Sequence, residues 1–349
     1  MLQWGFDKML GHLDAETLHE LYEAEVIRMG CANKAHAPFL TLVTASTVPS
    51  SAFQECLLPL LVPTCVLARP AHNLFGFLNE LHGLVRTINP EIAEAVAFVE
   101  TPGNLRDDLA ELVRCSKILS VAGSRNTIRV YRELAEEFNV NLVEHGHRMS
   151  VAWIPADALE NPRLDALAWD ICAWDNMGCL SPNALFVEDS VDNVVKLAHQ
   201  LLEEVEKVER ILQPMPMDKS ERIARNNGFR DAALDVECLL QSRSASADIP
   251  GTALLVFPEL QSAQDRFAPH YYPKTLNLFP CRPGLLPGFL EKYSPCGQCL
   301  ACPCGVEENV ISLCEHYGFN RFCRFGEMQD PPPTWKHDGI GTLTPLFIE

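Results

Sequence analysis

Residues 117–144 read KILSVAGSRNTIRVYRELAEEFNVNLVE, and they show the pattern of the fold most clearly. Residues 117–122 predict a buried strand, and the turn Gly123-Ser124 then opens a helix that we expect over residues 127–138. A second strand is expected directly afterwards, over residues 140–144. Strands that alternate with helices at this spacing predict a parallel sheet.

The same alternation extends on both sides of this stretch. Further buried strands are expected at 39–45, 64–68 and 95–100, with helices between them and a helix over 12–28 in front. A second unit begins near residue 150. It has expected strands at 151–154, 184–187, 252–257 and 275–279, and expected helices at 161–174 and 190–212. The sequence therefore predicts an α/β protein with a doubly wound sheet and a second α/β unit.

Composition and charge exclude several classes of function. The 349 residues carry 28 Lys and Arg against 46 Asp and Glu, a formal net charge of −18. Such a charge repels a phosphate backbone and an anionic membrane surface, so we exclude nucleic acid as a partner. The longest apolar run, 56–68, is broken by Pro59 and Pro63 and is too short to span a membrane. The first residues show no secretory signal, so we expect a cytoplasmic protein whose 14 cysteines are thiols or metal ligands rather than disulfides.

Polar turns follow three of the expected strands. They contain Ser46-Thr47-Val48-Pro49, Arg69-Pro70 and Gly123-Ser124. In a doubly wound sheet, ligands bind beyond the carboxyl ends of the strands, so these turns are candidate ligand contacts.

A separate candidate is the turn that contains Cys179. Gly178 allows a substrate to approach the backbone closely, and backbone N–H groups beside a cysteine stabilise a thiolate or an oxyanion. These features favour a nucleophile, but a single cysteine in a chain of 14 is more often a buried filler.

The block that contains this cysteine, Asp170–Glu188, resembles the acyl-CoA reductase or long-chain acyl-protein thioester reductase family. That family includes the fatty-acid reductase component of bacterial bioluminescence and belongs to the aldehyde dehydrogenase superfamily. Three more blocks match in the same order, namely Ala122–Thr127, Gly146–Val151 and Arg321–Gly339. The resemblance extends from about residue 13 to the C-terminus.

The resemblance implies an aldehyde dehydrogenase fold and a cysteine mechanism. Cys179 would attack a long-chain acyl-CoA or acyl-protein thioester, and NADPH would reduce the resulting acyl-enzyme to an aldehyde. An acyl-protein synthetase partner and a homo-oligomer are also implied. The implied domains are a cofactor-binding domain over 1–148, short at its N-terminus, a catalytic domain over 149–320, and a C-terminal return segment over 321–349.

By the same resemblance, Ser46, Pro49, Gly123 and Ser124 would contact the cofactor. Arg69 takes the place of a lysine that binds the adenosine ribose, and its charge would favour the 2′-phosphate of NADPH. Thr47 stands where the family has an asparagine that donates to the oxyanion, so we expect its hydroxyl to donate instead. Thr47 and the short N-terminus keep an alternative open, a catalytically degenerate scaffold of the same fold.

Cys296, Cys299, Cys302 and Cys304 form a cluster with the CxxC spacing of a metal-thiolate loop. Zinc or an iron–sulfur cluster is the expected ligand, with Cys314, His316 and Cys323 as further candidates. A metal or redox protein is therefore a third possible function, set against an accidental gathering of thiols in one loop.

Two histidines, His145 and His147, flank Gly146 and suggest a metal pair, although structural histidines in a domain-junction turn are the favoured interpretation. Glu144, beside them, is a loose match to the general base of aldehyde dehydrogenases, and we interpret it as a strand-end charge.

Overall fold

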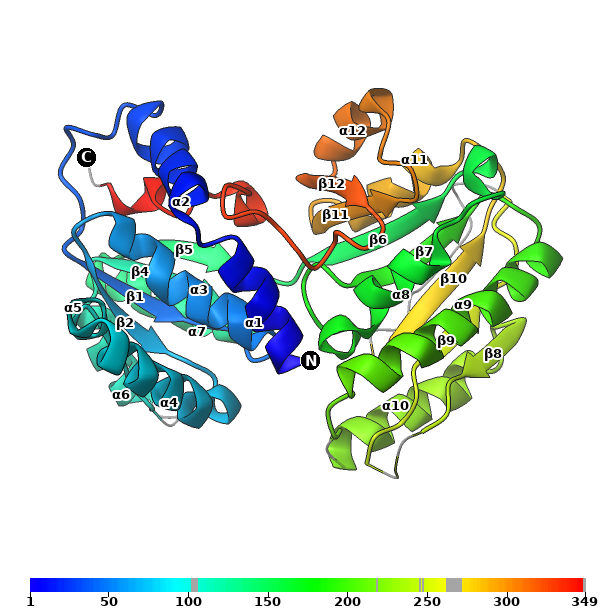
Figure 1. Ribbon diagram of the computed structural model, residues 1–349, viewed down its shortest axis with the longest axis horizontal. Coiled ribbons are helices and arrows are strands. Elements are labelled where there is room, and N and C mark those ends of the chain that lie inside the picture. The colour runs from blue at the N-terminus through cyan, green and yellow to red at the C-terminus, as the bar shows by residue number, and fades with distance from the viewer. Residues whose placement is uncertain (102–105, 218, 245, 247, 262–271, 348–349) are drawn as a thin grey trace. The chain divides into compact units, whose positions relative to one another are not determined.

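The computed structural model describes residues 1–101, 106–217, 219–244, 246, 248–261 and 272–347. The chain divides into two compact units (Figure 1). The five-stranded unit comprises residues 2–147 and 332–349, and the seven-stranded unit comprises residues 148–331 with Met1. The C-terminal return segment therefore begins at Pro332 and not at residue 321. Residues 321–324 form a strand of the seven-stranded sheet instead.

The first sheet is parallel throughout and has the order β3-β2-β1-β4-β5. Its strands are β1 (Phe39–Val43), β2 (Cys65–Arg69), β3 (Val96–Phe98), β4 (Ile118–Ala122) and β5 (Asn141–His145). The predicted doubly wound sheet is thus confirmed. The strand order reverses between β1 and β4, which makes the carboxyl ends of these two strands the switch point where such sheets bind ligands.

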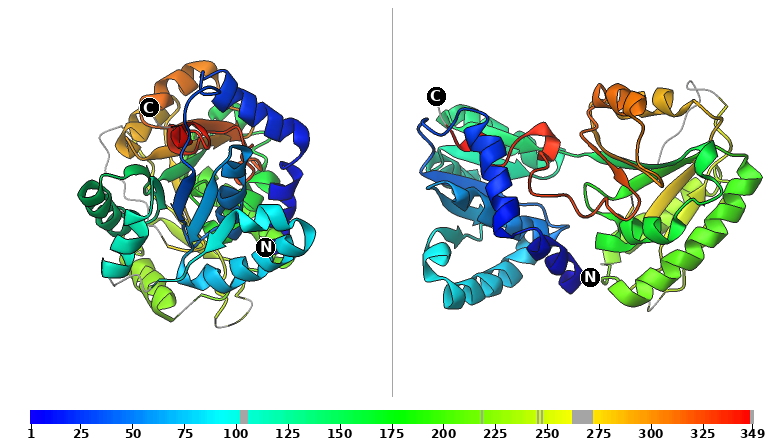
Figure 2. Two further views of the ribbon diagram at one scale, coloured as in Figure 1. Left: turned by 90° about the vertical axis from the view of Figure 1, so that its left-hand side faces the viewer. Right: turned by 45° about the horizontal axis from the view of Figure 1, so that its top comes forward.

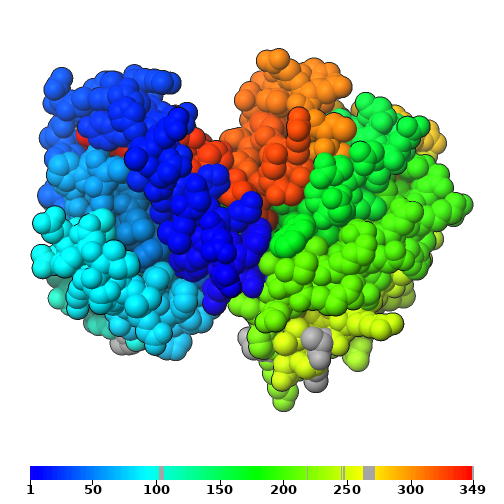
Figure 3. Space-filling model, viewed as in Figure 1, coloured from blue at the N-terminus to red at the C-terminus, as the bar shows by residue number. Residues whose placement is uncertain are grey.

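Within the described residues, seven α-helices belong to this unit. They are α1 (Leu2–Gly11), α2 (Ala15–Tyr22), α3 (Pro49–Leu57), α4 (His72–Ile88), α5 (Pro90–Glu94), α6 (Arg106–Arg114) and α7 (Arg125–Phe138). The helix expected over 12–28 ends at Tyr22 and continues as a π-helical turn, Glu23–Ile27. The sequence did not predict α1. This helix packs on α3 and α4 through the Phe6 ring, which lies 6.1 Å from Phe53 and 5.8 Å from Phe77 (dark blue in Figure 3).

Apolar side chains cover both faces of this sheet. Leu40 and Leu42 lie in a cluster with Leu343 and Leu346 from the C-terminal segment. On the other face, Val43 and neighbouring strand residues pack against α7. The red C-terminal segment therefore completes one side of the unit, as the views in Figure 2 show.

A buried carboxylate fixes the C-terminal segment to the N-terminal helices. Glu25, in the π-helical turn, is only 1% exposed. Its carboxylate accepts hydrogen bonds from the backbone N–H groups of Thr342, Leu343 and Thr344 at 2.9, 2.6 and 3.0 Å. Gly341 permits this approach, because a Cβ atom there would lie 2.5 Å from the Glu25 carboxylate.

The second sheet has the order β12-β11-β6-β7-β10-β9-β8 and is parallel except for the edge strand β8. Its strands are β6 (Met149–Ile154), β7 (Pro182–Val187), β8 (Cys238–Gln241), β9 (Ala253–Val256), β10 (Thr275–Pro280), β11 (Gly297–Cys302) and β12 (Arg321–Arg324). The helices are α8 (Leu164–Cys172), α9 (Val191–Leu212), α10 (Lys219–Ala232), α11 (Leu286–Leu290) and α12 (Glu308–Glu315).

The core of this unit is built on stacked aromatic rings. The Phe186 ring on β7 stacks on Phe279 of β10 at 5.5 Å and on Phe289 of α11 at 5.7 Å. The opposite face is covered by α9, which buries one stripe of apolar residues over β8, β9 and β10 (Figure 1). Among the described residues, no helix combines the length and the apolar character that crossing a membrane requires.

Candidate active site

Cys179 lies in a turn with an unusual backbone, just before β7. The three residues Trp174, Asp175 and Asn176 have φ angles of 55°, 54° and 59°. Left-handed conformations cost about 1–2 kcal/mol for each residue that has a Cβ atom. Three in succession therefore persist only where surrounding contacts fix them, and such backbone is concentrated at functional sites.

Hydrogen bonds with three strands, β6, β7 and β10, fix this turn. The Asn176 side-chain amide donates to the carbonyl of Pro182 at 3.1 Å and to that of Thr275 at 2.8 Å. The Ser150 hydroxyl donates to the carbonyl of Cys179 at 2.7 Å. Cys179 itself is half-buried. The turn therefore holds a partly accessible thiol on a rigid backbone.

A buried ion pair between Asp175 of this turn and Lys274 stabilises the turn. Lys274 Nζ lies 3.5 Å from Asp175 Oδ1, and the two side chains are only 1% and 9% exposed. Asp175 Oδ2 also accepts a hydrogen bond from the backbone N–H of Met215 at 3.1 Å. Burial raises the pKa of Asp175 and lowers the pKa of Lys274, while the attraction between the two charges opposes both shifts. Lys274 could not be predicted from the sequence, because it lies about a hundred residues from Asp175 in the chain.

The C-terminal block of the sequence resemblance contacts the same turn. The Gln329 side-chain amide donates to Ser181 Oγ at 3.2 Å, and Ser181 Oγ accepts from the backbone N–H of Gly178 at 3.1 Å. Gly178 precedes Cys179 directly. Gln329 therefore orients the Ser181 hydroxyl, and this hydroxyl fixes the backbone of Gly178 next to the cysteine.

Asp170, on α8, anchors this block. Its carboxylate accepts from the backbone N–H groups of Gly326 at 2.6 Å and Met328 at 3.1 Å. Burial raises the pKa of Asp170 to about 7, while these hydrogen bonds and the Arg321 guanidinium act in the opposite direction. Gly326 has a φ of 87°, and a Cβ atom there would lie 3.3 Å from Ala166 on α8. The segment thus packs closely on α8 only with glycine at this position.

The predicted metal loop at Cys296, Cys299, Cys302 and Cys304 is not supported. Residues 297–302 form β11, a fully buried strand inside the sheet. Successive side chains of a strand point to opposite faces, so residues 299 and 302 face different sides. The Cys299 thiol lies 3.6 Å from the Cys323 thiol, and burial raises the pKa of Cys299. Cys304 is exposed, and the four thiols do not form a ligand group among the described residues.

The predicted ligand contacts of the five-stranded unit lie at the carboxyl edge of its sheet. Ser46 and Thr47 follow β1, and Pro49 begins α3. Ser124 follows β4 and caps α7, with its hydroxyl accepting from the Thr127 N–H at 3.2 Å. These residues therefore flank the switch point of the sheet.

Arg69, the last residue of β2, lies at the same edge. Its guanidinium donates to the hydroxyl of Thr101 at 2.7 Å and to the Thr101 carbonyl at 3.2 Å, and it faces the Tyr131 hydroxyl. Glu144, in contrast, pairs with Arg132 of α7 at 2.6 Å, as expected for a strand-end charge.

Solved structures with the same fold are aldehyde dehydrogenases and related enzymes. A variant of proline utilization A from Bradyrhizobium japonicum matches with a TM-score of 0.62 and 14% identity, over 89% of this chain and 34% of the other. The NAD-dependent aldehyde dehydrogenase from Sinorhizobium meliloti matches with a TM-score of 0.62 and 12% identity, over 84% of this chain and 60% of the other. The chain thus spans about a third of the proline utilization A chains that it matches.

These likenesses define the class of protein as one with the aldehyde dehydrogenase fold. The chain belongs to the acyl-CoA reductase (LuxC) family, because the model of that family matches residues 34–249. The resemblance found in the sequence is thereby confirmed. No curated protein matches the chain in sequence.

Proposed function

We propose that the chain reduces a long-chain acyl thioester, carried by coenzyme A or by a protein, to an aldehyde through an acyl-enzyme on Cys179. The observation that carries the proposal is the half-buried Cys179 thiol on a turn that strained backbone and hydrogen bonds from Ser150 and Asn176 hold rigid. A nucleophile held in one orientation gains rate because the ordering is completed before the reaction begins.

The chemistry proceeds in two stages. The Cys179 thiolate attacks the acyl carbonyl, a new C–S bond forms, and the original thiol leaves with a proton. When bound, NADPH supplies a hydride to the acyl group. The thiohemiacetal on Cys179 then collapses to the aldehyde, which restores the thiol. We assign the Thr47 hydroxyl as a hydrogen-bond donor to the oxyanion. Because the family has an asparagine amide at this position, we expect a rate lower by a factor on the order of a hundred.

The residues at the carboxyl edge of the five-stranded sheet fit a nicotinamide dinucleotide. A Cβ atom at position 123 would lie 3.0 Å from Thr127 Cγ2, so glycine lets this turn pack closely on the first turn of α7. The backbone N–H groups at the start of that helix suit a phosphate. Ser46, Pro49 and Ser124 would line the same edge, and the Arg69 charge favours a 2′-phosphate. One solved neighbour, 3,6-anhydro-L-galactose dehydrogenase, matches with a TM-score of 0.60 and 12% identity, over 83% of this chain and 63% of the other. Its structure is described as a complex with NAP, which supports the choice of cofactor.

The test uses radiolabelled long-chain acyl-CoA without cofactor, followed by denaturation and counting of protein-bound label. We expect Cys179→Ala to lose the label. Cys115→Ala is the matched control, because Cys115 is an exposed thiol in the other unit and should leave labelling unchanged. Equal labelling of Cys179→Ala and the wild-type protein would refute the proposal.

A titration with NADPH separates the enzyme from a degenerate scaffold of the same fold. We expect saturable binding, and its absence at millimolar cofactor would favour the scaffold, for which Thr47 in place of an asparagine is the supporting feature. We further propose that an acyl-protein synthetase delivers the acyl group and that the protein forms homo-oligomers. Light scattering of the protein alone and with such a synthetase tests both.

A further inference from the structure

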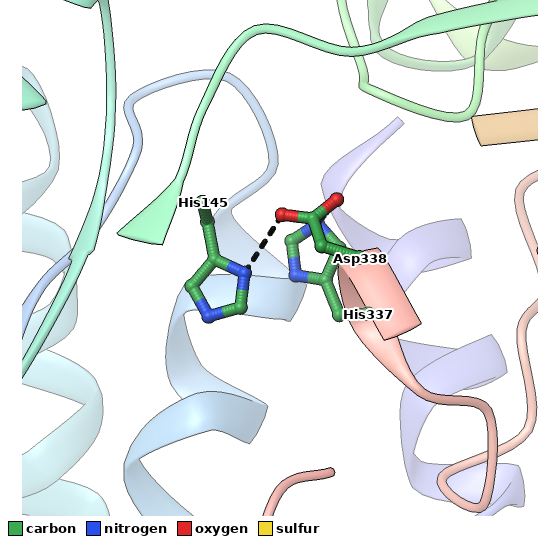
Figure 4. Close-up of side chains that lie close together, drawn as sticks. All are labelled: His145, His337 and Asp338. Carbon is green, nitrogen blue, oxygen red and sulfur yellow. Dashed lines mark hydrogen bonds and ion pairs between the residues drawn. The ribbon is translucent and has the colours of Figure 1, made fainter. Parts of the chain in front are cut away.

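A cluster of two histidines and an aspartate lies in the five-stranded unit, away from Cys179 in the chain. His145 is the last residue of β5, and His337 and Asp338 lie in a short 3₁₀ turn of the C-terminal segment (Figure 4). His145 Nδ1 lies 2.9 Å from Asp338 Oδ2, and His337 Nε2 lies 3.8 Å from Asp338 Oδ1. The two imidazole rings stack at 4.5 Å with an angle of 13° between them. The sequence had suggested a pair of His145 with His147, but His147 faces Arg125 instead.

The backbone presents these groups in a fixed arrangement. Asp338 has a φ of 59°, in the left-handed region, and its side chain is fully buried. The side chains of His145 and His337 are 16% and 29% exposed. One face of the cluster is therefore closed by protein, while the rings remain accessible to a small ion.

A second carboxyl group faces the same cluster. Glu55, on α3, interacts electrostatically with both His145 and Asp338. Its Oε1 accepts a hydrogen bond from the Ser51 hydroxyl at 3.2 Å. A divalent cation at the cluster would neutralise the carboxylate of Asp338 while the imidazoles stay neutral.

We propose that His145, His337 and Asp338 form a binding site for one divalent transition-metal ion of the zinc class. One ligand atom from each of the three residues lies within 4.8 Å of the others. Tetrahedral zinc with bonds of about 2.1 Å needs ligand atoms about 3.4 Å apart. Side-chain rotations that move the ligand atoms by about 1 Å would bring the three residues to this spacing. Imidazole nitrogen with carboxylate oxygen selects zinc or a neighbouring metal over magnesium or calcium.

A metal here would tie the C-terminal segment to the sheet. It would join the 3₁₀ turn at 337–339 to the end of β5, whose last carbonyl accepts a hydrogen bond from the Gly123 N–H at 3.2 Å. The ion would thus stabilise the unit beside the Gly123 turn. An ion that binds only the folded state raises the unfolding temperature as its concentration increases.

The experiment uses the full chain under reducing conditions, with cobalt(II) as a spectroscopic substitute for zinc. We expect about one ion per chain after dialysis, visible ligand-field bands, and no sulfur-to-metal charge-transfer band. That last feature distinguishes this site from binding by any of the 14 cysteines. Zinc should then displace cobalt and raise the thermal unfolding midpoint.

Two variants and one control complete the test. His337→Ala removes a partly exposed ring and keeps the His145–Asp338 hydrogen bond, so it should fold and lose the ion. Asp338→Asn should also lose it, because asparagine tolerates the left-handed backbone and carries no charge. His72→Ala is the matched control, since His72 and Glu100 form an exposed histidine–carboxylate pair at 2.6 Å in the same unit.

The outcomes decide between a metal site and a hydrogen-bonded clasp. Binding that is lost in His337→Ala and retained in His72→Ala supports the site. No binding at micromolar zinc, or binding that persists unchanged in His337→Ala, overturns the proposal. The contact between His145 and Asp338 would then be a structural hydrogen bond only.

Discussion

Replacing Asp170 by Asn separates the free-energy cost of burying a charge from the value of the hydrogen bonds around it. Asp170 is 1% exposed, and burial raises the pKa of its carboxyl from 3.8 to about 7. Between these two pH values the folded protein holds a proton that the unfolded chain has released. Each pH unit in that window therefore lowers the free energy of unfolding by about 1.4 kcal/mol. From pH 5 to pH 8 the loss amounts to about 3 kcal/mol, because it stops near pH 7.

Urea unfolding followed by tryptophan fluorescence measures this loss, with the wild-type protein and Asp170→Asn compared at pH 5 and at pH 8. The variant cannot ionise at this position and can still accept one backbone hydrogen bond through its carbonyl oxygen. Other carboxyls with raised pKa values, such as Glu55 and Asp175, cancel in the comparison.

We expect the wild-type protein to lose about 3 kcal/mol relative to the variant between the two pH values. A constant difference would refute the raised pKa. Such a constant difference would mean that the N–H groups of Gly326 and Met328, with Arg321, outweigh burial and hold the pKa of Asp170 low, because the carboxyl would then be ionised in both states over this whole pH range.

Three further predictions concern the cysteine turn, the cofactor edge of the five-stranded sheet and the anchor of the C-terminal segment. Gln329→Ala removes the hydrogen bond to Ser181, which is worth about 1 kcal/mol. The rate of acyl-enzyme formation should therefore fall roughly fivefold in a rapid-quench experiment. An unchanged rate would show that Gln329 does not position the turn at Cys179. Ser124→Asp keeps the helix cap of α7 but places a negative charge at its start, so thermal unfolding should change little while NADPH binding weakens at least about tenfold by calorimetry. Equal affinity would remove Ser124 from the cofactor site. Glu25→Ala leaves three buried backbone N–H groups without their acceptor, which should lower stability by about 3 kcal/mol or more in urea unfolding, and a loss below about 1 kcal/mol would contradict the role assigned to Glu25.

The parallel sheet of the five-stranded unit could be predicted because each strand is a short buried run between polar turns. The five strands differ from the expected ranges by only a few residues at their ends. The helix over 12–28 was predicted less well. Its apolar spacing continues past Tyr22, but the buried Glu25 carboxylate draws the backbone into a π-helical turn to reach the C-terminal segment. No local pattern reports a partner more than three hundred residues away.

The cysteine cluster shows the opposite error. Spacing alone made residues 296–304 resemble a metal loop, because the CxxC pattern does not tell whether the backbone forms a turn or an extended strand. Burial on both faces makes residues 297–302 a strand, and an extended backbone separates thiols that a loop would bring together.

The family, the alternation of strands and helices, and the position of Cys179 could be predicted from the sequence, because ordered blocks and hydrophobic periodicity are local properties of the chain. The contacts that hold the cysteine turn could not: they are the ion pair of Lys274 with Asp175, the hydrogen bond of Gln329 to Ser181, and the hydrogen bonds that Asp170 accepts. The approach of His145 to His337 and Asp338 likewise appears only in the folded chain. These contacts join residues far apart in sequence, and they form because packing of the sheets places the ends of distant strands and turns at the same edge.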